Sequence, residues 1–372
     1  MLYAVLTPLL PEITRELDLG KSTAGLLVAA YALGSLTGVL PAGLITIRLG
    51  AKIAVIAGMT LLAGASLVFA VAESLDALIA ARFLQGVSSA LSWTGGIAWL
   101  LSAAPRERRG QLLGTALGAG IFGAVFGPVL GSLAALTSRA VVFIGVAVLA
   151  SAAALFSLRL EYVHVRIPAP GALSRAGRNR TFLAGLGLMI VPAFLIGTIL
   201  VLGPLHLSAR GWGAAAIGAV WLVTAIIQSS ISPVLGHLSD QRGAIAPVVL
   251  LLALGATLSI ALAVMGEPLV YAVLLVAAGC VFGGLYAPAF ALIAHGAEDS
   301  GLPQGLAFAG MNAAWAIGAV IGPASGGAVA QATGDRVPLL LLAALCMATL
   351  VVASSSRRPN LVHSDDNPPL SS

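Results

Sequence analysis

Long, uninterrupted apolar runs dominate this sequence and limit what it can fold into. Twelve such runs occur in two groups of six, at residues 1–11, 23–45, 53–71, 77–102, 110–136 and 140–158, and then at 181–205, 213–235, 244–265, 269–294, 304–331 and 337–355. A helix that crosses a bilayer needs about 20 apolar residues, which all runs except the first supply. The first run is about half that length, and we expect the chain to begin inside its first helix.

The composition agrees with a lipid environment. The chain is 59% hydrophobic and 9% charged, with a mean hydropathy of +1.03. Soluble domains carry about 25% charged residues, so a water-soluble fold of this length could not cover its surface. The short alternating segments of a membrane β-barrel do not occur either. The sequence therefore predicts an all-α polytopic membrane protein.

The positive charges predict the orientation and the domains. Thirteen Lys and Arg residues lie in one alternate set of connections and five in the other, and the richer side is expected to be cytoplasmic. This places both termini in the cytoplasm. We predict two six-helix halves at 1–158 and 181–355, a cytoplasmic linker at 159–180 and a cytoplasmic tail at 356–372. Arg outnumbers Lys by seventeen to two, which favours a bacterial cytoplasmic (inner) membrane.

Other functional classes are poorly supported by the residues. Cys280 and Cys346 lie singly inside apolar runs, without the spacing of metal ligands. The histidines lie in or near connections, and the basic residues are scattered through short loops and form no continuous surface. We therefore predict no enzyme, cofactor or metal site and no nucleic-acid partner. A membrane-embedded enzyme and a sensor that binds without transport remain as alternatives.

The two halves share a repeat of landmarks. Gly43 and Gly50 recur at Gly236 and Gly243, an offset of 193 residues, and Gly127-Pro128 recurs 195 residues later at Gly322-Pro323. Because six helices return the chain to the side where it started, both halves have the same orientation in the membrane. This repeat is typical of transporters that bind their substrate between the halves near the midplane.

Two loops carry a common motif. The loop after the eighth run reads Gly-His-Leu-Ser-Asp-Gln-Arg-Gly and contains Asp240 and Arg242. Its copy after the second run keeps Arg48 and Gly50 but has Ile47 in place of the Asp. The fifth run contains the pattern G-x8-G-x3-G-P-x2-G, formed by Gly114, Gly123, Gly127, Pro128 and Gly131.

These motifs resemble those of the major facilitator superfamily, and the glycine pattern resembles its twelve-helix drug:proton antiporter family. The resemblance implies a gating role for the loop motifs and for the glycines and prolines of the fifth and eleventh helices. It implies that Asp240 faces the positive start of the fifth helix in the opposite half. Ile47 cannot make the mirrored contact, so we expect an asymmetric cytoplasmic gate.

Arg82 is the charged residue that we place well inside a span, and it begins an Arg-Phe-Leu-Gln-Gly motif of the same family. Intramembrane charge is costly and indicates function, although Arg82 lies near a helix end and snorkelling is the alternative. Helical spacing places polar residues beside it on one face. The predicted cavity residues are Arg82, Gln85, Ser89, Trp93, Thr224, Gln228, Tyr286, Asn312 and Trp315.

This weakly polar, aromatic set favours a hydrophobic or amphipathic organic substrate. We predict secondary active, proton-coupled export by alternating access, carried out by a monomer in the lipid bilayer. The alternative is an uptake carrier or uniporter for a metabolite. No Asp or Glu lies inside the apolar runs, so the acid that carries the coupling proton is absent from them. An acid preceding the first run, Asp76, or transport without coupling would each account for this.

Overall fold

The computed structural model describes residues 2–103, 109–162, 171–243 and 245–355. Within these residues the chain is helical and contains no β-strand. The first six helices are α1 (Leu2–Glu16), α2 (Lys21–Arg48), α3 (Ala51–Val71), α4 (Leu75–Ala103), α5 (Arg109–Leu136) and α6 (Arg139–Leu158). The others are α7 (Ala172–Ala176), α8 (Arg180–Ser208), α9 (Ala214–Arg242), α10 (Ile245–Val264), α11 (Pro268–Gly284), α12 (Tyr286–Asp299), α13 (Gln304–Thr333) and α14 (Arg336–Ser355).

The helices match the predicted apolar runs with two main differences. Helix α1 continues beyond the run 1–11 to Glu16, so it includes polar residues at its end. The run 269–294 forms two helices, α11 and α12, that meet at Leu285. Pro288 lacks an N–H group and cannot donate to the carbonyl of Gly284, which interrupts the helical hydrogen bonds at this point. Among the described residues, nine helical stretches are long and apolar enough to cross a membrane, and one of them combines α11 with α12.

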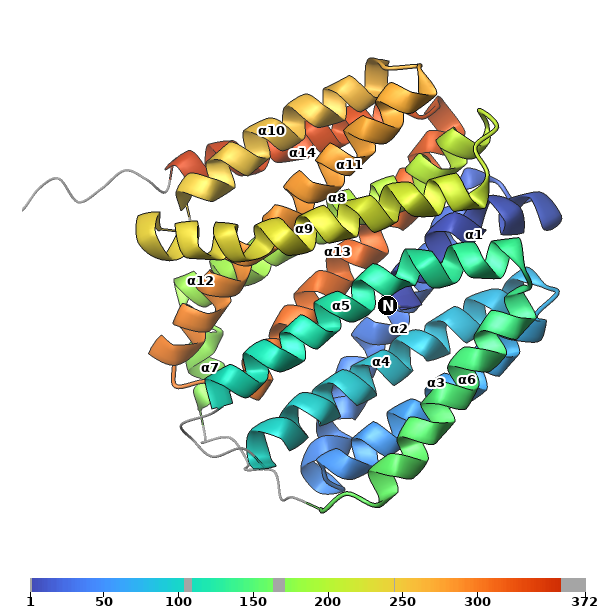
Figure 1. The fold of residues 1–372 in the computed structure, drawn as a ribbon. Helices are drawn as coiled ribbons and strands as arrows, with labels where there is room; N and C mark the ends of the chain where they lie inside the picture. Colours follow the sequence, from blue (N-terminus) through green and yellow to red (C-terminus); the bar gives the residue numbers. More distant parts are fainter. Residues whose placement is uncertain (1, 104–108, 163–170, 244, 356–372) are drawn as a thin grey trace, which may run out of the picture.

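Helices α1–α6 form an N-terminal half and α8–α14 a C-terminal half (Figure 1). In each half two outer helices pack against each other, α3 with α6 and α10 with α14. The repeat found in the sequence also recurs in space. Gly86 lies against the backbone of Tyr31. Their counterparts 193 residues later in the sequence, Gly279 and Thr224, also lie against each other.

The outer helices present apolar side chains outwards. Leu149 on α6 is 72% exposed and Val352 on α14 is 66% exposed. Exposed aliphatic side chains on a helix of this hydropathy are stable in contact with lipid tails, which need no hydrogen bonds. The outer helices therefore provide the surface that faces the bilayer, as the composition predicted.

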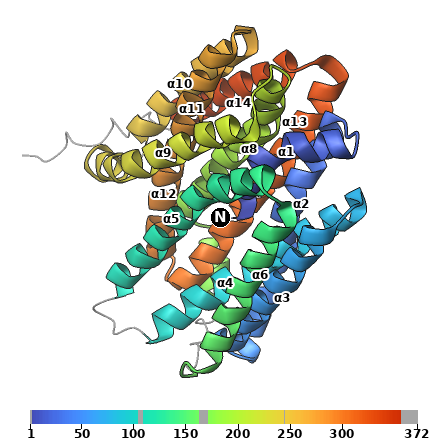
Figure 2. The ribbon, with the colours of Figure 1, turned by 45° about the vertical axis from the view of Figure 1, so that its right-hand side comes forward.

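The two halves meet mainly where α2 packs against α13 and α5 packs against α9, and α1 also contacts α8 and α9. We call the end of the molecule that carries Arg159 and α7 the linker end and the opposite end the far end. The far end carries the α1–α2 and α13–α14 connections. Helices α5 and α9 lie close together toward the far end and separate toward the linker end (Figures 1 and 2).

Candidate functional site

Arg82 is fully buried, with 0% of its surface exposed, two turns into α4. Its Nη1 atom donates to the carbonyl oxygen of Leu2 at 2.7 Å and to Oε1 of Gln85 at 3.1 Å. Its Nη2 atom donates to the carbonyl oxygen of Tyr3 at 3.4 Å. The guanidinium carbon lies 4.8 Å from the centre of the Tyr31 ring, within the range of a cation–π contact. Arg82 therefore points inwards and does not snorkel.

No described carboxylate forms an ion pair with Arg82, so carbonyl dipoles and a π face balance its charge. Nε of Arg82 and Nε2 of Gln85 are buried and have no hydrogen-bond partner among the described residues. Buried donors are nearly always satisfied in proteins, and an exception needs a water or a ligand to explain it. These two donors therefore mark a point where a bound molecule can be recognised.

Aromatic side chains from both halves form a series of contacts next to this arginine. Tyr3 lies 5.8 Å from Tyr31 and 5.2 Å from Trp315 between ring centroids, the latter in an edge-on arrangement. Tyr31 is hydrogen bonded to the side chain of Ser89, and Tyr286 to that of Trp315. Trp315 belongs to α13, so these contacts cross from one half to the other.

One hydrogen bond also joins the two halves near these aromatic rings. Nδ2 of Asn312 donates to Oγ of Ser35 at 3.4 Å, which joins α13 to α2. We use the term central cluster for the residues from both halves that meet around Tyr3. They are Tyr3, Tyr31, Ser35, Arg82, Gln85, Ser89, Tyr286, Asn312 and Trp315. Six of these nine were predicted from the sequence, whereas Tyr3, Tyr31 and Ser35 were not.

The remaining predicted cavity residues lie elsewhere. Trp93 packs beside Gly120 of α5. The methyl group of Thr224 lies against Gly279, and the amide of Gln228 lies against Gly283. Thr224 and Gln228 therefore occupy the contact between α9 and α11 within the C-terminal half. The helical spacing placed them on one face of α9 correctly, but that face packs against α11.

The glycine motif lies where helices nearly touch. A Cβ atom added to Gly131 of α5 would lie 2.1 Å from the carbonyl oxygen of Val5 in α1. A Cβ on Gly322 of α13 would lie 2.3 Å from the carbonyl oxygen of Phe194 in α8. Gly127 and Pro128 are buried, Gly123 is partly buried, and Pro323 packs against Gly197. The motif therefore lets α5 and α13 approach α1 and α8 backbone to backbone.

The predicted gating loops lie at the linker end. Arg48 is exposed, and Gly50 has a φ of 99°, which suits glycine and begins α3 after a sharp turn. Lys52 in the same loop donates to the carbonyl oxygens of Leu158 and Leu160, at 2.8 and 2.6 Å. Gly114 belongs to α5, but its surroundings, the side chains of Asp240 and Arg242, and the predicted contact of Asp240 with the start of α5 lie outside what the structure describes.

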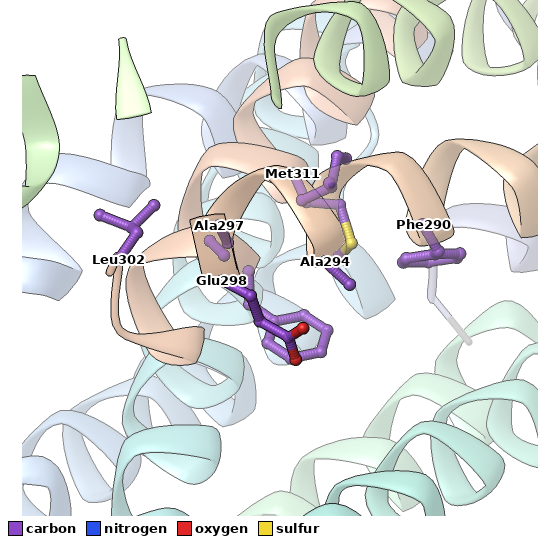
Figure 3. A pocket seen from close by; sticks show the side chains of 9 residues that line it. Phe290, Ala294, Ala297, Glu298, Leu302 and Met311 are labelled. Atoms are coloured by element: carbon purple, nitrogen blue, oxygen red, sulfur yellow. The ribbon is translucent and has the colours of Figure 1, made fainter. Parts of the chain in front are cut away.

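A small pocket lies between α12 and α13 near the linker end (Figure 3). Its volume is about 130 Å³, and its wall is apolar apart from Glu298. Figure 3 shows Phe290, Ala294 and Met311 facing the same space, with the Glu298 carboxylate at its edge. A space of this size accepts one aromatic ring. No group of His, Cys, Asp and Glu that could hold a metal occurs in the described part of the chain.

The far end is closed by contacts between the halves. Nζ of Lys21 donates to Oδ1 of Asp335, and the backbone N–H of Ser22 donates to Oε1 of Gln331 at 2.8 Å. Gln331 of the C-terminal half thus caps the first turn of α2 in the N-terminal half. Oγ of Ser132 in α5 also donates to the carbonyl oxygen of Ala214 in α9 at 3.3 Å. The described conformation is therefore closed at the far end.

Two helical halves with apolar outer surfaces that meet beside a buried cation have the architecture of a polytopic membrane transporter. The family model of the Major Facilitator Superfamily matches residues 1–307. The chain belongs to this superfamily, as its motifs predicted.

Individual relatives are more distant. The chain is 28% identical to multidrug resistance protein 2 of Bacillus subtilis (strain 168) over 338 residues, which cover 87% of this chain and 84% of that protein. It is 33% identical to the MFS-type transporter ppzB of Metarhizium majus (strain ARSEF 297) over 121 residues, 31% of this chain and only 26% of that protein. The crystal structure of the nucleoside transporter NupG aligns over 96% of both chains with a TM-score of 0.73 and 14% identity, a likeness of fold alone.

Proposed function

We propose that this chain is a secondary active transporter that exports small hydrophobic or amphipathic organic compounds by alternating access. The observation that carries the proposal is the central cluster, in which Arg82 and Gln85 offer unused donors among the rings of Tyr3, Tyr31 and Trp315. Such a surface binds the flat apolar part of a ligand by stacking and orients one acceptor group by hydrogen bonding.

The transport cycle needs the halves to part at the far end and to meet at the linker end. Parting breaks the Lys21–Asp335 pair, the Gln331 cap on α2 and the Tyr3–Trp315 contact. The last of these lies within the central cluster, so the motion that opens the far end also rearranges the substrate site. The glycine contacts within each half, such as Gly131 with Val5, stay together while the halves move as units.

Export is favoured over uptake by the glycine pattern of α5 and by the relative from Bacillus subtilis, whose name assigns it to multidrug resistance. Proton coupling is part of the proposal, and so is a cytoplasmic position of the linker end, because the connections on that side of the sequence carry the larger number of Lys and Arg residues. In this orientation the closed far end faces away from the cytoplasm, the compartment from which an exporter takes its substrate.

The test is transport by the purified chain in proteoliposomes with an imposed pH gradient. A panel of fluorescent compounds that contains a lipophilic cation, a neutral aromatic and a nucleoside would separate the substrate classes. We expect gradient-driven accumulation of an apolar aromatic compound, and its loss in Arg82→Ala. Transport of the nucleoside alone, or transport of any compound at a rate independent of the pH gradient, would contradict the proposal and favour a metabolite carrier. His295→Gln, which changes a histidine on α12 outside the central cluster, serves as a control.

A further inference from the structure

Three titratable side chains from three elements meet at the far end. Asp335, in the α13–α14 connection, accepts a hydrogen bond from Nζ of Lys21 on Oδ1 and lies 3.6 Å from Nδ1 of His206 through Oδ2. The His206 ring stacks on the ring of Tyr271, with centroids 3.9 Å apart. We call Lys21, His206, Tyr271 and Asp335 the far-end cluster.

The partners of Asp335 belong to different halves. Lys21 begins α2 in the N-terminal half, whereas His206 lies near the end of α8 in the same half as Asp335. Tyr271 on α11, which stacks on His206, also belongs to the C-terminal half. When the halves part at the far end, Asp335 therefore loses Lys21 and keeps His206.

Asp335 is held in its charged form by these neighbours. Burial by itself would raise the pKa of Asp335, but hydrogen bonds from His206 and Lys21 and the positive charge of Lys21 outweigh it and hold the pKa below its ordinary value. Loss of Lys21 would leave a partly buried carboxylate, 22% exposed, without its full positive charge. A partly buried charge needs a replacement partner or a proton.

His206 can supply that replacement. Its side chain is 11% exposed, and Nε2 is buried without a hydrogen-bond partner among the described residues. A neutral ring that carries its proton on Nδ1 leaves only an acceptor unpaired at Nε2, whereas a protonated ring would leave a charged donor unpaired. Lys21 faces the same carboxylate and Arg210 donates to the backbone oxygen of His206, so two further cations lie near the ring in the closed state.

We propose that His206 and Asp335 form a proton-sensitive latch that controls the opening of the far end. As the far end opens, Lys21 leaves Asp335, water reaches Nε2, and His206 takes one proton from the far-end compartment to become the new cation beside Asp335. As the far end closes, Lys21 returns to Asp335 and the proton goes back to the far-end compartment. One positive charge thus replaces the other beside the carboxylate. The inference rests on the proposed alternating access, and it assigns a pH-dependent gate to the far end of the bundle.

Distance measurement between spin labels tests this directly. Ser74 in the N-terminal half and Ala209 in the C-terminal half are exposed at the far end and can be changed to cysteine in a background where Cys280 and Cys346 are replaced by alanine. Labelled protein in liposomes would be measured between pH 8 and pH 5.5. One linked proton raises the ratio of open to closed molecules by up to about tenfold per pH unit.

We expect the longer distance to gain population on acidification and His206→Gln to abolish this dependence. Lys21→Gln should give a larger open population already at pH 8. His295→Gln is the matched control and should behave as the unmodified protein does, because its ring bonds to the backbone oxygen of Ala291 on α12. An unchanged pH response in His206→Gln, or distances that ignore pH in the unmodified protein, would overturn the inference.

The same liposomes distinguish this inference from the proposed function. Gradient-driven export together with an unchanged pH response in His206→Gln would reject the far-end proton site and leave the exporter intact. A pH response that depends on His206, without transport of any compound in the panel, would reject the substrate class and leave the proton site standing.

Discussion

Gly25 of α2 and Pro323 of α13 face each other across the two halves with almost no space between their backbones. A Cβ atom added to Gly25 would lie 2.2 Å from the carbonyl oxygen of Pro323. A backbone oxygen cannot turn away as a side chain can, so any larger residue at this position opposes the contact. The contact between Gly25 and Pro323 forms only while α2 and α13 are packed together. A substitution at Gly25 therefore tests how much this contact stabilises the closed state.

Gly25→Val should therefore shift the protein toward the state that is open at the far end. Overpacking a close contact costs about 1–3 kcal/mol, which corresponds to about 5- to 150-fold in the ratio of open to closed molecules. A cysteine at Ser35, which is buried on the same helix, should then react faster with an impermeant maleimide added from the far side. Gly64→Val is the control, since nothing lies within 4 Å of a Cβ at Gly64. Equal labelling rates in the two variants would refute this prediction.

Arg82→Met should abolish transport without lowering the thermal stability of the purified protein. Burying a guanidinium costs several kcal/mol in lost hydration, and Arg82 recovers this through carbonyl oxygens and a π face without a described carboxylate. Methionine fills much of the same volume and has no charge to desolvate. The midpoint of thermal unfolding and the export rate would be measured together. A large fall in the midpoint would show that Arg82 mainly holds α1 against α4.

Gln331→Ala should weaken far-end closure and leave the open state unaffected. The change removes the acceptor for the N–H of Ser22 at the start of α2, and loss of such a cap costs about 0.5–2 kcal/mol. Because the acceptor comes from the opposite half, only the closed state loses the bond. The spin-label distances at a fixed pH would show the change as a larger open population. Gln331→Glu keeps an acceptor and should restore closure.

Asp335→Asn should lower the thermal stability of the closed protein at neutral pH and have little effect in acid. The pKa of Asp335 is held below its ordinary value, so the stabilisation is fully present above the ordinary aspartate value of about 3.9. It is lost as the pH falls through the lowered pKa, because Asp335 then becomes neutral, as the asparagine of the variant is at every pH. Thermal unfolding of both proteins would be followed from pH 7 to pH 3. A difference in thermal stability between the two proteins that stays constant from pH 7 to pH 3 would contradict the assigned ion pair between Asp335 and Lys21.

The sequence predicted part of the central cluster well. Arg82 and Gln85 follow one another at helical spacing in a recognisable motif, and the structure joins them by a hydrogen bond. Tyr3 and Tyr31 were missed, because an aromatic residue in an apolar run looks the same whether it faces lipid, a neighbouring helix or a cavity. Thr224 and Gln228 were predicted to line the cavity because they are polar residues on one face of α9. In the structure this face packs against glycines of α11.

The far-end cluster could not be found from the sequence. Lys21 and Asp335 are 314 residues apart and lie in short connections, where charged residues are ordinary. His206 reads as a polar residue at a helix end. Only the packing of α2 against α13, and of α8 against α11, brings the three side chains together with Tyr271.

The sequence by itself determined the class of this protein, because the length and hydropathy of its runs permit only membrane-spanning helices and its repeat requires two parallel halves. Periodicity also fixed which residues share a helix face. The tertiary structure decided which face meets which helix, because van der Waals contact between apolar helices depends on where glycines allow close approach. That packing placed Arg82 among aromatic rings and joined Lys21 to Asp335 across the halves.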